Sequence, residues 1–354
     1  MIKVLIVDDS ALIRSVLETL LSADPNIHVV GTACDPMDAR GKIKTLNPDV
    51  VTLDIEMPNM NGLAFLEKIM RLRPTPVVMI STLTQKGARE TLLALELGAV
   101  DFVAKPGHDL EGGLEGFGRE VREKVIAASQ SDVKGRAMAR QPASGAGAKR
   151  AAVPSKVNSS RKALIALGAS TGGVEAIKTV LSGLPKDCPP VVIAQHMPAG
   201  FTERFASRLN EVSGLTVVEA KDREPVKPGH AYIAPGGAHL RVEYSSGQLK
   251  CRIGEDEVVS GHRPSVDVLF SSVAKQVGDF AVGAILTGMG KDGAQGLLEM
   301  RQAGAYTIGQ SQSSALIYGM PGAAKALGAV QEETKIESIA SKLISALEAK
   351  RDAA

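Results

Sequence analysis

The chain of 354 residues contains no tryptophan, and its aromatic residues make up only 3% of the total. Sites that bind single-stranded nucleic acids are commonly built from aromatic rings on which the bases stack, so this scarcity argues against such a site. The 41 basic and 39 acidic residues nearly cancel, which leaves no overall positive field of the kind that a dedicated nucleic-acid-binding protein needs. The core must therefore consist mainly of aliphatic side chains.

Cysteine is also scarce, with only Cys34, Cys188 and Cys251 in the whole chain. An odd number at such wide spacing provides neither a disulfide framework nor a zinc cluster. No hydrophobic run approaches the roughly 20 residues of a membrane-spanning helix. The first apolar run, residues 2–7, ends at once in two aspartates, unlike a signal peptide. We therefore expect a cytoplasmic protein with no direct membrane insertion.

The length suggests about two domains of roughly 150 residues each, and one segment divides them. Residues 130–160 are rich in Ala, Ser, Gly and Pro, lack Leu and Ile, and carry a net charge of +5 (six basic residues, one acidic). Such a composition cannot bury enough apolar surface to offset the entropy lost on ordering. We expect a flexible tether, with a basic docking arm as the alternative. The predicted organisation is a first domain over 1–125, a linker over 126–160 and a second domain over 161–350.

Before the linker, short apolar runs alternate with amphipathic stretches, the pattern of a parallel sheet with helices on both faces. The expected strands are Ile2–Val7, His28–Cys34, Val50–Leu53, Val77–Ile80 and Asp101–Ala104. The expected helices include Ala11–Leu21, Gly62–Arg71 and Gly87–Leu97. The first domain is therefore predicted to be a doubly wound, flavodoxin-like α/β domain.

After the linker the same alternation resumes and predicts a second, Rossmann-like α/β domain with a mostly parallel sheet. Its expected strands are Ala163–Leu167, Val191–Ala194, Thr216–Glu219, Ala231–Ala234, Ala281–Leu286 and Tyr306–Gly309. Its expected helices lie near Gly173–Leu181, Phe201–Val212, Val266–Val277, Ala294–Gln302 and Ile336–Lys350. A hairpin is expected within Leu240–Ile253, with its turn at Ser246-Gly247.

Charged and hydroxyl side chains follow the strands of the first domain. Asp8 and Asp9 come after the first strand, Asp54 after the third, Ser81 after the fourth and Lys105 after the fifth. The carboxyl ends of parallel strands meet at one edge of a sheet, so these side chains should converge. A small set of oxygen ligands suits Mg²⁺, and a carboxylate beside Mg²⁺ and lysine is suited to attack a phosphoryl group. Each residue alone has a simpler explanation, such as a helix cap or an exposed turn.

These residues also carry a family resemblance. The motifs that resemble the receiver domain of bacterial response regulators are Val7–Ser10, Asp54–Pro58 with Asn61-Gly62, and Lys105-Pro106. The resemblance implies that Asp54 accepts the phosphoryl group from a histidine kinase. It also implies that Asp8, Asp9 and Asp54 hold Mg²⁺. Ser81 is implied to be the switch hydroxyl, and Lys105 to pair with the phosphoryl group. The Lys105–Pro106 bond is expected to be cis, as the family pattern implies.

A possible nucleophile lies in the second domain. The glycine-rich stretch Gly168–Gly173 follows a predicted strand and precedes a predicted helix, as in the turn that exposes a catalytic serine, here Ser170. A phosphate-binding turn or a simple tight turn fits the stretch equally well. His196 and Asp292 also follow strands of the same sheet, so the three residues could serve as nucleophile, base and orienting group. Three other histidines compete with His196 for the base role: His230, His239 and His262.

A second glycine-rich stretch, Gly288–Gly293, formally matches the dinucleotide fingerprint G-x-G-x-x-G. The next strand, however, is followed by Gln310, where that fingerprint requires an acid to bind the ribose, so dinucleotide binding is disfavoured. The glycines on either side of Met289 are better explained by an oxyanion hole, because they expose a backbone N–H group.

The second domain resembles the catalytic domain of the chemotaxis methylesterase (CheB) family. The motifs that carry this resemblance are Gly168–Gly173, Gln195–Thr202, Ala234–Gly237, His262–Asp267 and Gly288–Gly293. It implies Ser170 as nucleophile, His196 as general base and acid, and Asp292 as the residue that orients His196. It also implies the Met289 N–H as an oxyanion donor.

The activity implied by this resemblance is phosphorylation-activated hydrolysis of glutamyl methyl esters on methyl-accepting chemoreceptors, without a cofactor for the esterase reaction. Deamidation of specific receptor glutamines is implied as a second activity. A DNA-binding output domain is the alternative from another class. About 190 residues of α/β pattern far exceed a helix-turn-helix, however, so no DNA partner is expected. A degenerate esterase that serves as an adaptor or phosphate sink also stays open.

Overall fold

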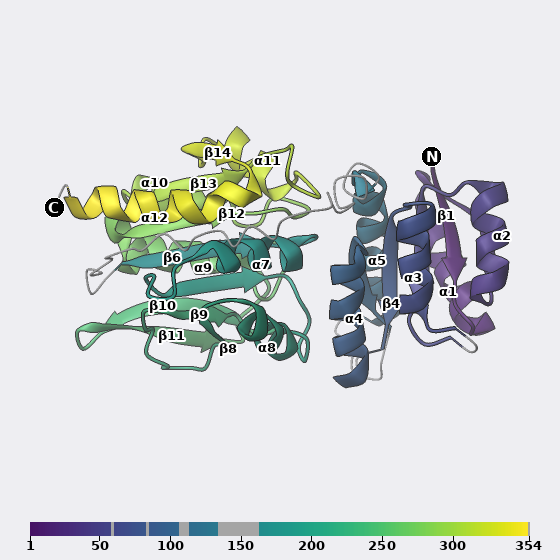
Figure 1. Ribbon diagram of the computed structural model, residues 1–354, viewed down its shortest axis with the longest axis horizontal. Helices are drawn as coiled ribbons and strands as arrows, with labels where there is room; N and C mark the ends of the chain where they lie inside the picture. Colours follow the sequence, from purple (N-terminus) through teal and green to yellow (C-terminus); the bar gives the residue numbers. More distant parts are fainter. Residues whose placement is uncertain (58–59, 83–84, 106–112, 134–162, 353–354) are drawn as a thin grey trace, which may run out of the picture. The chain divides into compact units, whose positions relative to one another are not determined.

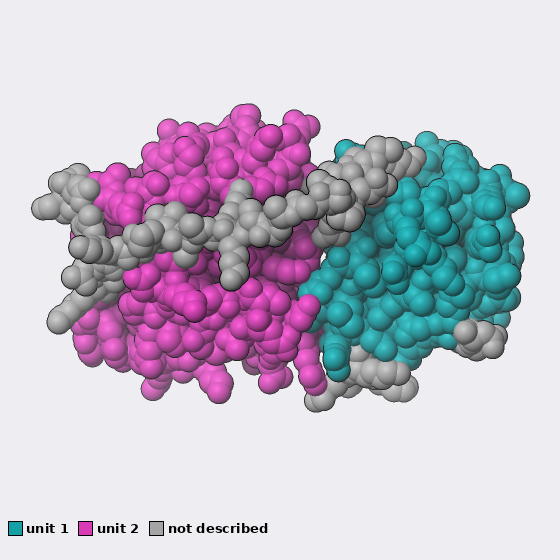
Figure 2. Space-filling model, in the orientation of Figure 1, with its two compact units in different colours: residues 1–147 teal, residues 148–354 magenta. Residues whose placement is uncertain are grey.

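The computed structural model of the chain describes residues 1–57, 60–82, 85–105, 113–133 and 163–352. The chain divides into two compact units, residues 1–147 and 148–354, which Figure 2 colours separately. Each unit is an α/β structure with a parallel sheet of its own. Most of the predicted tether falls in residues 134–162, which lie outside the described residues.

The first unit is built around a five-stranded sheet in the order β2-β1-β3-β4-β5, in which every neighbouring pair is parallel. Its strands are β1 (Ile2–Val7), β2 (Ile27–Ala33), β3 (Val50–Asp54), β4 (Val77–Ser81) and β5 (Asp101–Ala104). Its helices are α1 (Ala11–Ser22), α2 (Pro36–Leu46), α3 (Gly62–Leu72), α4 (Gln85–Leu97) and α5 (Gly113–Ser129). Helix α1 packs against α5, and α3 packs against α4 (Figure 1). The predicted doubly wound fold of this unit is confirmed.

Local sequence explains where several of these elements begin. Residues Val4–Val7 of β1 are at most 1% exposed, as expected for a parallel strand covered by helices on both faces. Helix α1 begins after Ser10, whose Oγ accepts the Ile13 N–H at 3.4 Å. Helix α3 begins after Asn61, whose Oδ1 accepts the Leu63 N–H at 2.8 Å. Such short polar side chains satisfy N–H groups that have no partner within the helix.

Helix α5 continues to Ser129, into the stretch that the sequence assigned to the linker. Its last turns contain Val125, Ala127 and Ala128, which are at most 2% exposed. Alanine is a strong helix former, and a buried apolar face stabilises a helix that would otherwise end. Alanine-rich composition alone therefore does not mark the point where the helix ends.

The second unit is built around a seven-stranded parallel sheet in the order β14-β13-β12-β6-β7-β9-β8. Its strands are β6 (Leu164–Ala169), β7 (Val191–Gln195), β8 (Thr216–Glu219), β9 (His230–Ile233), β12 (Ala281–Ile285), β13 (Tyr306–Gln310) and β14 (Glu332–Thr334). The predicted hairpin is present as the antiparallel pair β10 (His239–Ser245) and β11 (Gln248–Gly254). Its turn residues, Ser246 and Gly247, both have positive φ. The predicted mostly parallel α/β fold is confirmed here too.

Helices cover this sheet in two groups (Figure 1). Helix α12 packs against α7, whereas α10 packs against both α9 and α11, and the hairpin lies against α9. The helices are α7 (Gly173–Gly183), α8 (Thr202–Val212), α9 (Val266–Gln276), α10 (Ala294–Gln302), α11 (Met320–Ala326) and α12 (Ile336–Asp352), with the short 3-10 helix η1 (Gly278–Phe280) before β12. Among the described residues, no helix has both the length and the apolar character needed to cross a membrane.

Besides the short helix η1, two elements of the second unit, α11 and β14, are not among those expected from the sequence. Helix α11 has 7 residues and begins with Met320-Pro321, and β14 has only 3 residues. A periodic hydrophobic pattern needs a longer stretch to become visible, so both elements depend on tertiary contacts that the local sequence does not reveal.

Two phenylalanines offer a matched test of this core. Phe270 on α9 is 0% exposed, whereas Phe280 in η1 is 37% exposed. We expect Phe270→Ala to lower the free energy of unfolding by about 3–5 kcal/mol, because it removes packing and leaves a cavity. Phe280→Ala should cost less than about 1 kcal/mol. Urea unfolding of both variants measures the difference, and equal losses would contradict the described packing.

Candidate active site

The carboxyl edge of the first sheet brings three acidic residues and a lysine together. The Lys105 Nζ lies 2.9 Å from Asp8 Oδ2 and 2.9 Å from Asp54 Oδ2. Carboxylate oxygens of Asp8, Asp9 and Asp54 all lie within 4.8 Å of one another. The donor set consists of oxygens only, which fits a hard divalent cation such as Mg²⁺.

Burial shapes the electrostatics of this acidic cluster. Burial raises the pKa of Asp54 to about 6, although its hydrogen bond with Lys105 and the attraction of that charge lower it. Burial alone would lower the pKa of Lys105, but its contacts with Asp54 and Asp8 outweigh burial, and the net direction is upward. Lys105 thus forms ion pairs with two buried carboxylates, those of Asp8 and Asp54. The cluster retains excess negative charge that a cation would balance.

A glycine allows the chain to close over Asp54. The Gly62 N–H donates to the Ile55 carbonyl at 2.9 Å, which folds the start of α3 back against the end of β3. A Cβ at Gly62 would lie 2.1 Å from the Asp54 carbonyl oxygen, so no other residue fits without a backbone shift. The Asn61-Gly62 pair in the sequence therefore reflects a close approach of two backbone segments.

Ser81 lies at the same edge, but the structure does not join its hydroxyl to Asp54. The Ser81 Oγ is 2.8 Å from the Thr91 Oγ1 on α4, and both side chains are buried. The Lys105 N–H donates to the Ser81 carbonyl at 2.6 Å. Nothing in the local sequence pointed to Thr91, because it lies in the middle of a helix. The expected cis bond between Lys105 and Pro106 lies outside the described residues.

The carboxyl edge of the second sheet joins Ser170, His196 and Asp292 in one hydrogen-bonded chain. Ser170 follows β6, His196 follows β7, and Asp292 lies in the loop between β12 and α10. The His196 Nδ1 is 3.0 Å from the Ser170 Oγ, and the His196 Nε2 is 2.7 Å from Asp292 Oδ2. The structure therefore brings together the three residues that the sequence placed at separate strand ends.

Asp292 is held at the N-terminus of α9. Its Oδ1 accepts hydrogen bonds from the Ser265 Oγ at 2.8 Å and the Asp267 N–H at 3.1 Å, and its Oδ2 accepts the Val266 N–H at 2.7 Å. A helix N-terminus also carries partial positive charge. Burial raises the pKa of the Asp292 carboxyl, but the hydrogen bonds from His196, Val266 and Ser265 outweigh burial and bring it to about 2.

This ionised carboxylate determines the tautomer of His196. Asp292 can only accept a hydrogen bond when ionised, so the His196 Nε2 carries the proton and Nδ1 is left as an acceptor facing Ser170. The turns that carry these two side chains are also linked, because the Gln195 Nε2 donates to the Ser170 carbonyl at 3.0 Å and to the His196 carbonyl at 3.1 Å.

The three competing histidines occupy other positions. His230 Nδ1 is 3.0 Å from the Pro228 carbonyl. His239 is buried, with Nε2 3.0 Å from the Glu257 carbonyl and Nδ1 accepting the Ser265 N–H at 3.1 Å. The His262 ring stacks on the His196 ring. Within the described part of the chain, only His196 contacts Ser170 through a ring nitrogen.

The loop after β12 lies directly beside Ser170. The Ser170 N–H donates to the Thr287 carbonyl at 3.0 Å, and a Cβ at Gly288 would lie 2.8 Å from the Ser170 Cβ. The next amide belongs to Met289, and within the described ranges its N–H donates to no protein acceptor. An uncommitted N–H one residue from this contact fits the expected oxyanion donor. The Thr287 side chain links this loop to the segment before α11, because its Oγ1 accepts the Ile317 N–H at 2.9 Å.

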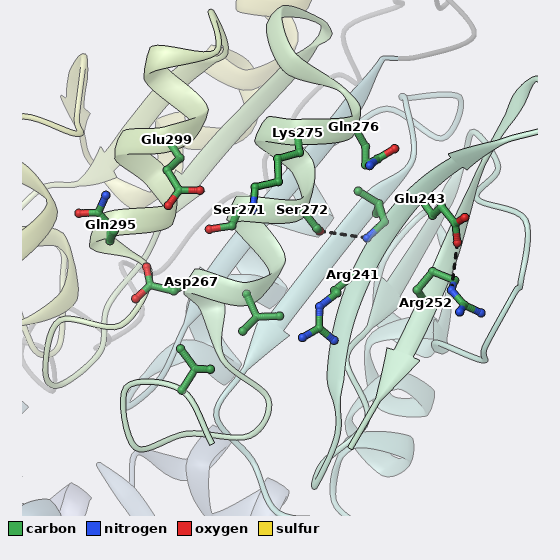
Figure 3. Close-up of a pocket in the computed structure, with 13 residues that line it drawn as sticks. Arg241, Glu243, Arg252, Asp267, Ser271, Ser272, Lys275, Gln276, Gln295 and Glu299 are labelled. Carbon is green, nitrogen blue, oxygen red and sulfur yellow. Dashed lines mark hydrogen bonds and ion pairs between the residues drawn. The ribbon is translucent and has the colours of Figure 1, made fainter. Parts of the chain in front are cut away.

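A hollow of about 640 Å³ lies on the flank of α9 (Figure 3). Figure 3 shows polar side chains lining it from three sides: Arg241 and Arg252 from the hairpin, Lys275 from α9, and Glu299 from α10. Ser170, His196 and Asp292 do not line this hollow. The chemistry indicated by the sequence therefore lies at the edge of the sheet and not in this hollow.

Two residues that support the hydrogen-bonded chain, Ser265 and Gln195, could not be identified from the local sequence. Ser265 and Gln195 fall within motifs that carry the family resemblance, but nothing in the local sequence assigned them a contact with Asp292 or with the Ser170 turn. A serine before a predicted helix signals an N-cap, and the Ser265 Oγ does accept the Val268 N–H at 3.4 Å. The same hydroxyl donates to Asp292, a contact between residues 27 positions apart that local patterns do not encode.

The fold, and the residues gathered at the carboxyl edges of its two sheets, define a two-domain protein in which a receiver-type domain precedes an α/β enzyme domain. Residues 4–111 match the family model of the response regulator receiver domain, and residues 165–343 match that of CheB methylesterase. The chain belongs to the CheB methylesterase family.

Full-length relatives agree with this assignment. The chain is 54% identical over 346 residues to protein-glutamate methylesterase/protein-glutamine glutaminase 1 of Xanthomonas campestris pv. campestris, with 97% of each chain covered. It is 55% identical over 351 residues to the Caulobacter vibrioides protein of the same name, with 99% of each covered. The crystal structure of the Thermotoga maritima CheB methylesterase catalytic domain matches 52% of this chain and 97% of that one, at 36% identity and a TM-score of 0.51.

The low pKa of Asp292 predicts a pH-dependent contribution to stability. The carboxyl titrates at about 2 in the folded chain and near its ordinary value of 3.8 in the unfolded chain. Its contribution is therefore fully present above about pH 4 and is lost as the pH falls toward 2. At pH 5 we expect Asp292→Asn to lower the free energy of unfolding by about 2 kcal/mol. Urea unfolding from pH 5 to pH 3 should show this difference shrinking, and a constant difference would count against the assigned pKa.

Proposed function

We propose that this chain is a phosphorylation-activated protein-glutamate methylesterase. It hydrolyses glutamyl methyl esters on methyl-accepting chemoreceptors to glutamate and methanol, and it deamidates specific receptor glutamines. The observation that carries the proposal is the hydrogen-bonded chain from Ser170 through His196 to Asp292. The relatives that match nearly the whole chain are named for the same two activities.

The first chemical step follows from the orientation of His196. The Ser170 Oγ attacks the ester carbonyl carbon while His196 Nδ1, 3.0 Å away, takes the hydroxyl proton. His196 then carries a proton on both nitrogens, and the Asp292 carboxylate at 2.7 Å stabilises this imidazolium. Asp292 keeps its negative charge throughout, since its pKa of about 2 lies far below neutral pH.

The oxyanion of the tetrahedral intermediate accepts a hydrogen bond from the Met289 N–H. His196 donates its Nδ1 proton to the departing methoxide, which leaves as methanol, and the glutamyl group stays bonded to the Ser170 Oγ. Water, deprotonated by His196, attacks this acyl-enzyme, and the Ser170 oxygen leaves with the proton. For a glutamine substrate the leaving group is ammonia, and the other steps are unchanged.

Phosphorylation of Asp54 by a chemotaxis histidine kinase regulates this activity in our proposal. Asp8, Asp9 and Asp54 are the residues that would hold Mg²⁺, which neutralises negative charge on the phosphoryl oxygens when bound. Lys105 pairs with the phosphoryl group from its position between Asp8 and Asp54. Ser81 acts as the switch hydroxyl by exchanging its contact with Thr91 for one with the phosphoryl group. We place the protein in the cytoplasm, where its free cysteines, Cys34, Cys188 and Cys251, stay reduced.

Removing the nucleophile tests the esterase assignment. We expect Ser170→Ala to lower methanol release from methylated receptor membranes by at least about 10⁴-fold, because the acyl-enzyme can no longer form. Ser207→Ala is the matched control, since the Ser207 hydroxyl donates to the Glu203 carbonyl within α8. Methanol release by Ser170→Ala near the wild-type rate would refute the assignment, and no release by the wild-type chain would favour a degenerate esterase.

Removing the phosphoryl acceptor tests regulation. Asp54→Asn should abolish the increase in methanol release that a small-molecule phosphodonor produces in the wild-type chain, because the amide cannot accept the phosphoryl group. Asp38→Asn is the control, since Asp38 forms a half-exposed ion pair with Lys42 on α2. Methanol release is measured with and without phosphodonor for all three proteins. Stimulation of Asp54→Asn equal to that of the wild type would refute the assignment of Asp54.

A further inference from the structure

One histidine outside the hydrogen-bonded chain touches the proposed base directly. The His262 and His196 ring centroids are 3.6 Å apart, and the ring planes differ by only 16°. We propose that His262 is a positioning residue, whose flat ring holds the His196 imidazole in the plane that joins Ser170 to Asp292. This inference rests on the proposed function, because it assigns His262 a role through His196.

The need for such a support follows from the geometry of the hydrogen bonds. The bonds to Ser170 and Asp292 hold the two nitrogens of the His196 ring, but small coupled rotations about the two side-chain torsions of His196 can still tilt the ring out of the plane of these bonds. A parallel ring in van der Waals contact with one face blocks that tilt on its side. It also excludes water from that face, and the His196 side chain is only 9% exposed. A misplacement of about 1 Å can cost roughly 10²-fold in rate, so this restraint acts on the reaction.

The chain presents His262 from a tight turn. The Val259 N–H donates to the His262 carbonyl at 3.1 Å, and the His262 N–H donates to the Val259 carbonyl at 2.9 Å. The two residues between them, Ser260 and Gly261, have φ values of 54° and 82°. Positive φ at both central residues is the signature of a type I′ turn, which leaves little freedom at its ends. The His262 backbone is therefore well fixed.

The turn is tied to the same helix that holds Asp292. The Ser260 Oγ donates to Asp267 Oδ2 at 3.2 Å, and Asp267 Oδ1 accepts the Gly296 N–H at 2.7 Å. The Asp267 N–H in turn donates to Asp292. The start of α9 thus supports His196 in two directions: through Asp292 at the ring edge, and through the turn that carries His262 at the ring face.

Three substitutions in the full chain separate a planar support from other roles. His262→Phe keeps a flat ring, His262→Leu fills a similar space without one, and His262→Ala removes both. We expect kcat for methanol release within about threefold of wild type for Phe, and a loss of about 10- to 100-fold for Leu and Ala, with KM within about twofold throughout. His230→Ala is the control, because the His230 ring lies parallel to Tyr232, at 6.1 Å between centroids, and contacts no residue of the hydrogen-bonded chain.

A second readout isolates the attack by Ser170 from receptor binding. The rate at which a fluorophosphonate probe labels Ser170 should follow the same order as kcat, with Phe near wild type and Leu and Ala slower. Melting midpoints are measured for every variant. If His262→Ala does not fold, the Phe and Leu variants decide, because both fill the space and only one carries a ring.

The inference is overturned if Leu or Ala matches the wild-type kcat and labelling rate, if Phe is as slow as Leu, or if the loss appears only in KM. The first outcome shows that no support is needed, the second that the imidazole nitrogens matter, and the third that His262 contacts the substrate. Ser170→Ala, assayed in parallel, separates these outcomes from failure of the proposed function. If that variant retains activity, the proposed function fails whatever His262 does.

Discussion

The proposed chemistry of the second unit depends on the buried carboxylate of Asp292 and on the hydrogen bonds that it accepts. Asp292 accepts four hydrogen bonds: from His196, from the Ser265 hydroxyl and from two N–H groups at the start of α9. A buried carboxylate would otherwise take up a proton, because burial disfavours its charge. The hydrogen bond and charge of His196, together with the donors at the start of α9, keep Asp292 ionised, and an ionised Asp292 sets the tautomer of His196. The proposed reactivity of Ser170 thus depends in part on the packing of a helix N-terminus against the edge of a sheet.

The first unit also contains a buried carboxylate, Asp54, but its surroundings affect the pKa differently. Asp54 and Asp292 are each at most 2% exposed and lie at the carboxyl edge of a parallel sheet, yet the pKa is about 6 for Asp54 and about 2 for Asp292. Asp292 has a full set of donors, whereas Asp54 shares Lys105 with Asp8. The difference matches the proposed roles. Asp292 orients a base and needs no further partner, whereas Asp54 belongs to a cluster that a divalent cation and a phosphoryl group would complete.

Much of this arrangement could be predicted from the sequence, because it depends on strand ends. The alternation of strands and helices predicts two parallel sheets, and both are confirmed. Residues that directly follow strands, such as Ser170 and His196, meet at one edge as the topology requires. The supporting contacts could not be predicted: Ser265 reaches Asp292 across 27 positions, and Thr91 reaches Ser81 from the middle of a helix. Short elements such as β14 were missed because three residues show no periodicity.

Asp292 leaves the His196 Nδ1 free to accept the Ser170 proton in our proposal, and ¹⁵N NMR of the imidazole shows which nitrogen carries the proton. With ¹⁵N-histidine in the full chain, the His196 signals are assigned by comparison with His196→Gln. In the neutral imidazole we expect a non-protonated, hydrogen-bonded Nδ1 and a protonated Nε2 whose proton is shifted far downfield by Asp292. In Asp292→Asn this downfield proton should be lost. A neutral imidazole with its proton on Nδ1 in the wild-type chain would show that Asp292 does not set this tautomer.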